Sequence, residues 1–287
     1  MDLSTFAAEV GATDPVSISG LGSRGGAVAG VRTVGAPAGI TWIEPAEMTA
    51  SCGAGTAVAE LDEALREHGQ CVAIPPSGSV GGALAVGRSG LRRLGYGPLR
   101  DAVLQARYVS AAGELVKAGG PTVKNVSGFD LCRLLVGSRG TLGFLGDVIL
   151  RTRPRARFEQ WFRGAVDPDE VVARLYRPTA VLWDGSWVWV LLEGEPGDVE
   201  QQTAPLGLTV VDGPPELPAG GRWSIAPGAY RALRGRFVVE LGVGVVHHED
   251  PPPPRDSGPV LRDLHRRIKE QFDPTGRLNP GVDVLDG

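Results

Sequence analysis

The stretch KNVSGFDLCRLLVGSRGTLG, from Lys124 to Gly143, decides how the rest of the chain is interpreted. It combines a Lys-Asn pair, the short apolar helix seed Leu131, Leu134 and Leu135, and four glycines, three of which follow the seed at intervals of three residues. Glycine permits tight turns and close approach of the backbone to another group. No packing need is evident for glycines directly after a helix, so we expect a flat or polyanionic ligand to lie against this backbone.

A second glycine-rich stretch precedes it, GSVGGALAVGRSGLRRLGYGPLRD, from Gly78 to Asp101. Its many small residues suit a helix start that lies against a planar ligand, and close packing of a helix on a sheet is the alternative. Arg92, Arg93 and Arg100 are placed either to hold phosphates or a carboxylate or to face solvent.

Near the N-terminus, the predicted strand PVSIS (residues 15–19) runs into GLGSRG, which matches the dinucleotide-binding pattern of glycines. A Rossmann fold requires a helix directly after such a loop. The glycines and the proline between residues 25 and 39 disfavour that helix. We therefore predict a strand, a loop that cradles phosphate with successive N–H groups and the Ser23 hydroxyl, and an irregular excursion; a glycine-rich hairpin without a ligand is the alternative.

Together these stretches resemble the FAD-binding domain of the FAD-linked oxidases, the vanillyl-alcohol oxidase and p-cresol methylhydroxylase (PCMH) family. Within this family the sequence most resembles the smaller FAD-binding subunit of bacterial glycolate oxidase, a branch that also resembles the FAD-linked D-lactate dehydrogenases. The likeness runs from about Ser17 to Pro154 and returns at Phe272 to Gly281. Phe129 departs from the family pattern, which usually has tyrosine there.

The resemblance implies FAD as the cofactor and predicts its ligands. The predicted cofactor-binding residues are Gly20, Leu21, Gly22, Ser23, Arg24, Pro76, Ser79, Val80, Gly81, Gly82, Gly87, Gly90, Gly97, Asp101, Lys124, Asn125, Gly140, Gly143 and Asn279. Asp101 is expected to orient other groups and not to act as an acid or base. Asn279 is expected near the flavin edge, or alternatively in a turn that only pins the tail.

The expected fold is α+β: a PCMH-type FAD-binding domain of two α+β subdomains over residues 1–154, then a small α+β cap over 155–250. Residues 251–287 form a linker and a helix whose tail returns to the FAD domain. A change in composition supports the first boundary, because 26 of the 42 glycines lie in residues 1–150 and five of the six tryptophans lie after 154. The cap is smaller than in self-sufficient relatives.

His247, His248, Glu249 and Asp250 form a candidate metal site, because some relatives hold a divalent ion in the cap. Adjacent residues on a strand point to opposite faces, so at most two of these side chains share an ion, and we predict no metal. The two histidines are also the only candidates for a catalytic base, and the sequence does not fix their geometry; no catalytic residue is assigned.

Composition limits the class of partner. A net charge of -4 argues against a nucleic-acid-binding protein. The sequence contains no run of about eighteen apolar residues, so direct insertion into a membrane is not expected. The N-terminus does not read as a secretory signal, and three cysteines without CxxC spacing indicate reduced, buried thiols. We expect a cytoplasmic protein, associated with membranes only through partners.

The leading hypothesis is an FAD-binding subunit of a glycolate or related 2-hydroxy-acid oxidase complex, with a larger FAD-containing subunit and an iron-sulfur subunit as partners by resemblance. A self-sufficient D-lactate or 2-hydroxy-acid dehydrogenase and a non-catalytic structural subunit are the alternatives. No histidine lies between Met1 and Glu67, where covalently flavinylated relatives place their linking residue. FAD is therefore expected to be non-covalent.

Overall fold

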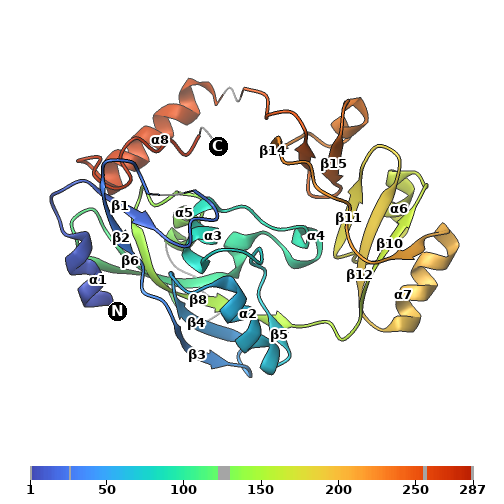
Figure 1. Cartoon of the computed structure of the whole chain (residues 1–287), viewed down its shortest axis with the longest axis horizontal. Coiled ribbons are helices and arrows are strands. Elements are labelled where there is room, and N and C mark those ends of the chain that lie inside the picture. Colours follow the sequence, from blue (N-terminus) through green and yellow to red (C-terminus); the bar gives the residue numbers. More distant parts are fainter. Residues whose placement is uncertain (1, 26, 122–129, 255–256, 286–287) are drawn as a thin grey trace. The chain divides into compact units, whose positions relative to one another are not determined.

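The computed structural model describes residues 2–25, 27–121, 130–254 and 257–285, which divide into two compact units (Figure 1). Unit 1 comprises residues 1–90, 98–155 and 255–287, and unit 2 comprises 91–97 and 156–254. The segment 91–97 thus packs with the second unit although it precedes the predicted boundary, and the C-terminal segment packs with the first.

Unit 1 is built on a five-stranded antiparallel sheet. Its strands, in spatial order, are β3 (Ile40–Glu44), β4 (Thr49–Gly53), β8 (Phe144–Arg151), β6 (Val103–Val109) and β7 (Leu115–Gly119). Strand β8 pairs with both β4 and β6 and joins the β3–β4 and β6–β7 hairpins into one sheet. Strand β8 has neighbours on both sides and layers on both faces, and seven of its eight residues are buried, including Asp147, which pairs with Arg107.

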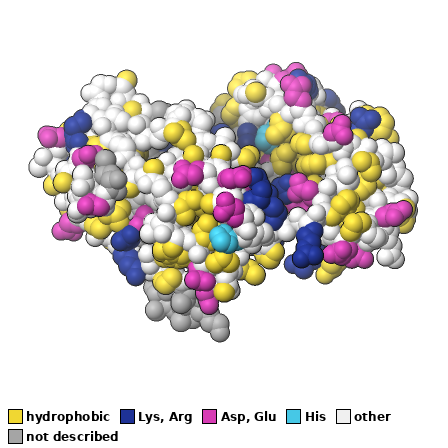
Figure 2. All heavy atoms as spheres, turned by 60° about the horizontal axis from the view of Figure 1, so that its bottom comes forward, with side chains coloured by type: hydrophobic (Ala, Val, Ile, Leu, Met, Phe, Trp, Pro, Cys, Tyr) yellow, Lys and Arg dark blue, Asp and Glu magenta, His cyan; other side chains and the backbone are white. Residues whose placement is uncertain are grey.

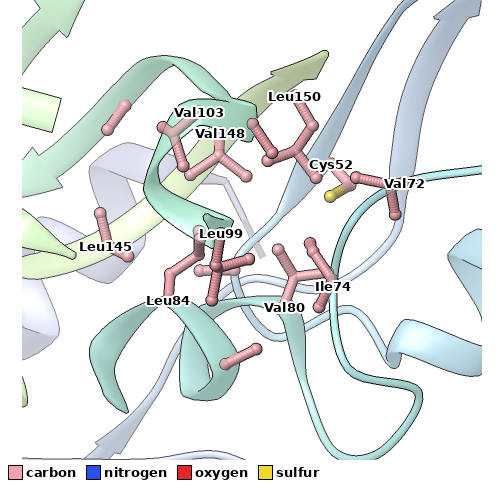
Figure 3. Close-up of a cluster of buried hydrophobic side chains, with 14 of the residues drawn as sticks. Cys52, Val72, Ile74, Val80, Leu84, Leu99, Val103, Leu145, Val148 and Leu150 are labelled. Carbon is pink, nitrogen blue, oxygen red and sulfur yellow. The ribbon is translucent and has the colours of Figure 1, made fainter. Parts of the chain in front are cut away.

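One face of this sheet carries α2 (Val58–Glu67), α3 (Val80–Val86) and α5 (Leu131–Leu135). Figure 3 shows Val80 and Leu84 of α3 facing Val148 and Leu150 of β8 across the core. Helix α2 has no side-chain cap, and the hydroxyl of the nearby Thr56 bonds the backbone of Gly39. It therefore fastens the loop before β3 to the helix start.

The other face carries α1 (Leu3–Val10) and the small parallel pair β1 (Val16–Ser19) and β2 (Arg32–Gly35). Phe6 and Val10 of α1 pack with Val16, Phe144 and other buried residues. No helix occurs among the described residues between β1 and β2. The strand, glycine loop and irregular excursion predicted for this region are confirmed, and a Rossmann unit is excluded.

The C-terminal segment returns to unit 1 through α8 (Gly258–Phe272). After the helix, Arg277 donates to the carbonyls of Asp14 (2.9 Å), Val10 (2.6 Å) and Ala111 (3.1 Å). Leu278 forms a parallel bridge with Val16. The tail therefore lies along β1, at the strand that leads into the first glycine loop.

Unit 2 is a seven-stranded sheet whose neighbouring strands all pair antiparallel. In spatial order its strands are β13 (Thr209–Val211), β10 (Glu159–Gly164), β12 (Val188–Glu193), β11 (Ala180–Trp183), β15 (Phe237–Glu240), β16 (Val245–His248) and β14 (Gly221–Ser224). The helices α6 (Pro168–Arg174) and α7 (Pro196–Thr203) and the 3-10 turn η3 (Ala229–Ala232) cover one face with a continuous apolar core.

The remaining elements are short. They are β5 (Gln70–Cys71) paired with β9 (Arg153–Pro154), α4 (Arg93–Tyr96), η1 (Leu99–Ala102) and η2 (Ala204–Leu206). Helix α4 belongs to unit 2, where Gly95 N–H donates to Thr179 C=O at 3.1 Å. Both units mix helix and sheet, so the expected α+β class is confirmed.

Figure 2 shows acidic and basic side chains interspersed over the face that it draws. That mixture does not resemble the one-sided basic surface of a nucleic-acid-binding protein. Within the described part of the chain, no helix has the length and apolar character needed to cross a bilayer.

The three cysteines are buried and unbridged. Burial raises the pKa of Cys52 to about 12, and burial also raises the pKa of Cys132. Because the thiolate is the reactive form, we expect a water-soluble thiol reagent at neutral pH to leave Cys52 unmodified in the folded protein and to modify it after denaturation. Mass spectrometry of the labelled peptides tests this, and fast labelling of native Cys52 would contradict its buried position.

Candidate functional site

The two glycine runs singled out in the sequence meet in unit 1. A Cβ atom on Gly20 would lie 2.6 Å from Ser79 Oγ, and a Cβ on Gly78 would overlap Ser23 Oγ. Gly78 has φ +70°, which further favours glycine there. The loop after β1 and the segment before α3 therefore form one cradle, which we define as residues 20–24 and 76–82.

The 20–24 loop presents backbone to solvent. Gly22 has φ +72°, and no atom lies within 4 Å of the position that a Cβ would take. The N–H groups of Leu21 and Gly22 donate to no described residue, and the Leu21 side chain is 62% exposed. Successive free N–H groups in a glycine-rich loop form an anion-binding concavity.

Arg24 crosses from one side of the cradle to the other. Its Nη2 donates to Pro75 C=O at 3.1 Å and to Ser77 Oγ at 3.3 Å. Its Nη1 is buried and has no hydrogen-bond partner among the described residues, and burial lowers the pKa of this guanidinium. A buried donor without a partner lowers the stability of the folded protein, and a bound anion would accept a hydrogen bond from Arg24 Nη1.

The N–H donors of residues 80–82 are used inside the protein. Val80 N–H donates to Thr56 C=O, Gly81 N–H to Ala54 C=O and Gly82 N–H to Ser79 Oγ. These residues hold the second side of the cradle in place, and a ligand would contact their surface more than their N–H groups. Pro76 is exposed beside the residues that bind Arg24.

Two predicted ligand glycines, Gly87 and Gly90, lie at and after the end of α3. Gly87 ends the helix in the left-handed region, and a Cβ there would lie 2.9 Å from Gly137 Cα. Gly90 has Pro75 as its near neighbour, 3.8 Å from the point where a Cβ would lie. Close packing, the alternative to a ligand contact in this stretch, thus accounts for Gly87.

The expectation that no packing need accounts for the glycines at 140 and 143 is wrong, and their predicted contact with FAD stays a prediction. A Cβ on Gly140 would lie 2.7 Å from Asn279 Nδ2, and one on Gly143 would overlap the Tyr108 ring. Internal packing therefore requires glycine at both positions. Lys124 and Asn125 lie outside the described residues, so their predicted contact with FAD stays a prediction.

Asn279 connects three segments. Its Oδ1 accepts from Ile18 N–H at 3.1 Å, its Nδ2 donates to Arg139 C=O at 2.6 Å, and its own N–H donates to Val16 C=O at 2.9 Å. Both ends of the amide are occupied, which favours the role of a pin for the tail. Through Ile18 this pin also holds the strand that enters the cradle.

The contacts of Asp101 and Gly97 are with residues outside the cradle. Asp101 is exposed and pairs with Arg133 at 2.9 Å, while Gly97 belongs to unit 2. Arg92, a candidate anion ligand, forms ion pairs with Glu159 (2.8 Å) and with Glu193 in unit 2. Its guanidinium is therefore occupied by carboxylates of its own unit.

The two histidines of unit 2 have different surroundings. His248 is buried and uses both ring nitrogens on backbone, Nε2 on Arg234 C=O (2.7 Å) and Nδ1 on Asp250 N–H (2.9 Å). His247 instead bonds Glu240, at 2.9 Å. No group of three potential metal ligands occurs in the part of the chain that the structure describes.

Glu240 and its neighbour Arg222 were not predicted from the sequence. The signal available was a single acid at the end of an otherwise apolar strand, FVVE. A carboxylate at a buried strand position is expensive unless it is paired, so such an acid indicates that polar partners lie nearby in the fold.

The cradle fits a pyrophosphate on three counts: glycines that close contacts enforce, free backbone donors and an unpartnered buried guanidinium nitrogen. The family model described as the FAD binding domain matches residues 35–119, and that of the FAD linked oxidases, C-terminal domain, matches residues 231–282. Both matched models describe FAD-linked oxidases, and the chain is an FAD-dependent oxidoreductase.

Among curated relatives, the chain is 28% identical to glycolate oxidase subunit GlcE of Escherichia coli K12, over 85% of this chain and 84% of that subunit. It is 41% identical to D-lactate dehydrogenase of Archaeoglobus fulgidus, over 38% of this chain but only 25% of that enzyme. Identity to glycolate oxidase subunit GlcD of Bacillus subtilis is 34% over 39% of this chain and 25% of that subunit.

A solved structure of alkyldihydroxyacetonephosphate synthase superposes with a TM-score of 0.68 over 94% of this chain and 73% of that one, at 14% identity. At that identity the match supports the fold alone, which is the PCMH-type fold predicted from the sequence.

Proposed function

We propose that this chain is the FAD-binding subunit of a dehydrogenase complex that oxidises a small 2-hydroxy acid such as glycolate. The observation that carries the proposal is the extent of the similarity to GlcE, which covers 84% of that subunit. The match to D-lactate dehydrogenase covers only 25% of that enzyme. This contrast favours a complex subunit over the self-sufficient dehydrogenase.

In this proposal the backbone donors of Leu21 and Gly22, the Ser23 hydroxyl and Arg24 Nη1 hold the FAD pyrophosphate. Ser79 and Gly82 fix the facing side of the cradle. When bound, FAD supplies the acceptor for a hydride. The residues of unit 1 bind and orient it, and Asn279 keeps β1 and the tail in register.

The partners we propose are a larger FAD-containing subunit and an iron-sulfur subunit. The names of GlcE and GlcD describe both as subunits of glycolate oxidase, which supports an assembly with more than one flavoprotein chain. Such a complex would be cytoplasmic, and membrane association would come only through partners.

The test is anaerobic reduction of the FAD-loaded protein. We expect glycolate or D-lactate to bleach the oxidised flavin absorbance, and purified partner subunits to speed the transfer to an external acceptor. Steady turnover with a dye by the isolated chain would replace the subunit proposal with the self-sufficient one. A colourless protein that takes up no added FAD would support the structural role instead.

The same preparation tests how FAD is held. We expect acid precipitation to release all of the flavin into the supernatant, because the cradle offers hydrogen bonds and ion pairs and His68 is the first histidine of the chain. Absorbance of the pellet and supernatant measures the split. Flavin that stays with the washed pellet would contradict non-covalent binding.

A further inference from the structure

The C-terminal tail, which we define as residues 273–279, lies beside the strand that leads into the FAD cradle. Val16 N–H donates to Arg277 C=O at 2.9 Å, and Asn279 N–H donates to Val16 C=O at 2.9 Å. These bonds place the tail along β1 as a further strand, in a sheet that otherwise has only the two short strands β1 and β2. A two-stranded sheet is marginally stable by itself, so the position of β1 depends on the tail.

Asn279 joins the tail to both sides of the cradle. Its Oδ1 accepts from Ile18 N–H at 3.1 Å, two residues before the first side of the cradle begins. Its Nδ2 donates to Arg139 C=O at 2.6 Å. Arg139 N–H donates in turn to Ala85 C=O at 2.8 Å in α3, the helix that starts in the second side. One side chain therefore connects the two segments whose separation sets the width of the cradle.

The two residues that share this bond both have a left-handed backbone. Asn279 has φ +46° and Arg139 has φ +51°. Asparagine adopts this conformation more readily than most residues, whereas it is unfavourable for arginine. Strained backbone persists where the surrounding contacts enforce it, and it is concentrated at functional sites. The strain at Arg139 therefore indicates that the fold holds this carbonyl in position for Asn279.

Polar contacts hold the tail in place, and α8 adds little. Arg277 is 2% exposed and its guanidinium donates to three backbone carbonyls of unit 1. Leu278 is the one buried apolar side chain of the tail, and no residue of α8 is buried. Segments with few buried apolar contacts open at a lower free energy than the core. Release of the tail is therefore easier than unfolding of unit 1.

We propose that Asn279 is a positioning residue for FAD and that docking of the tail closes the cradle; this rests on the FAD site of the proposed function. With the tail docked, β1 holds the 20–24 loop against residues 76–82. With the tail released, Ile18 and Arg139 lose their shared partner, and the two sides of the cradle are no longer held at a fixed separation. Bound FAD therefore favours the docked tail, and the docked tail strengthens FAD binding by the same factor.

The first experiment measures hydrogen exchange in the wild-type protein. The N–H groups of Ile18 and Asn279 are both bonded across the contact between β1 and the tail, so they should exchange together. Without FAD we expect both to exchange faster than the amides of the buried strand β8, which report unfolding of the core. Saturating FAD should slow exchange at both amides about tenfold or more, a typical size for coupling between two sites.

The second experiment compares two variants of the tail by titrating the flavin-free proteins with FAD. Glycine adopts a positive φ without strain, so Asn279→Gly removes the two side-chain bonds and keeps the backbone bond to Val16. We expect the dissociation constant for FAD to rise about tenfold. Thr275→Ala is the matched control, because the Thr275 hydroxyl bonds only Asp273 inside the tail, and it should leave FAD affinity unchanged.

Wild-type FAD affinity in Asn279→Gly would overturn the inference and leave the proposed function intact. Exchange at Ile18 and Asn279 that is no faster than in β8, or that FAD does not slow, would also overturn it, and this measurement needs no variant to fold. If FAD binds but no 2-hydroxy acid reduces it, the proposed function fails, while the two experiments still determine whether FAD and the tail are coupled. A wild-type protein that takes up no FAD would overturn both.

Discussion

Asp273→Asn is expected to lower the free energy of unfolding of unit 1 by about 3–5 kcal/mol, the usual cost of breaking a buried ion pair. The Asp273 side chain is fully buried. It accepts from Lys269 Nζ at 2.6 Å and from the N–H groups of Leu278 (2.8 Å) and Arg277 (3.1 Å). Asparagine keeps the size but removes the charge that Lys269 faces, and it loosens the turn that sets Leu278 beside β1.

The pH dependence follows from the same contacts. Burial alone would raise the pKa of Asp273, but the hydrogen bonds from Lys269 and the two backbone groups outweigh it and lower the pKa below its usual value. A group whose pKa is lowered on folding contributes stability above its unfolded pKa of about 4, and that stability is lost as the pH falls through the folded pKa. The difference between wild type and Asp273→Asn should therefore shrink in acid.

Urea unfolding followed by circular dichroism, at neutral pH and in acid, measures both effects. Asp263→Asn is the matched control, because Asp263 lies on the helix α8 that also carries Lys269 and pairs with Arg266 at the surface. An exposed pair of this kind contributes about 0.2–1 kcal/mol. If Asp273→Asn and Asp263→Asn lower the free energy of unfolding by the same amount, burial of Asp273 has no energetic consequence.

Gly22→Ala should weaken FAD binding by about tenfold or more, which corresponds to about 1.4 kcal/mol. Gly22 has φ +72° and open space where a Cβ would point. In the proposed cradle that space belongs to the pyrophosphate, so the methyl group would push the anion away from the donors of Leu21 and Gly22. Titration of the flavin-free protein with FAD, followed by flavin fluorescence, measures the affinity.

Gly30→Ala is the control for backbone strain. Gly30 has φ +75° and also has nothing within 4 Å of a Cβ, but it lies outside the cradle. Alanine in the left-handed region costs about 1–2 kcal/mol at either position, so both variants should lose similar stability. An equal fall in FAD affinity in both variants would show that the 20–24 loop does not bind the pyrophosphate.

Much of the fold could be predicted because its signals are local. Val58, Leu61 and Leu65 recur at helical spacing and are the buried face of α2, and Asp184-Gly185, a dipeptide typical of turns, joins β11 to β12. Pairing between distant strands was harder. The sequences of β6 and β7 do not indicate that β8 joins their hairpin to β4. The register and the neighbours of a strand depend on which apolar faces the whole sheet can bury.

The site was predictable to a similar degree. The 20–24 loop and residues 76–82 stood out in the sequence as runs of small residues, and the structure brings them together. The roles of individual glycines were not, because Gly140 and Gly143 are required by Asn279 and Tyr108, which lie far away in the sequence. The Glu240 carboxylate was missed for the same reason, since its partners come from two other strands.

The sequence by itself determined the α+β class of this chain and the positions of its glycine-rich turns, because glycine conformation and apolar periodicity act over a few residues. Only the tertiary structure decided which glycines are required by a neighbouring side chain, and which partners each of two adjacent histidines bonds. Those outcomes depend on atoms brought together by folding from distant parts of the chain, and the energy of a close contact or a hydrogen bond depends on distance in space and not on separation in sequence.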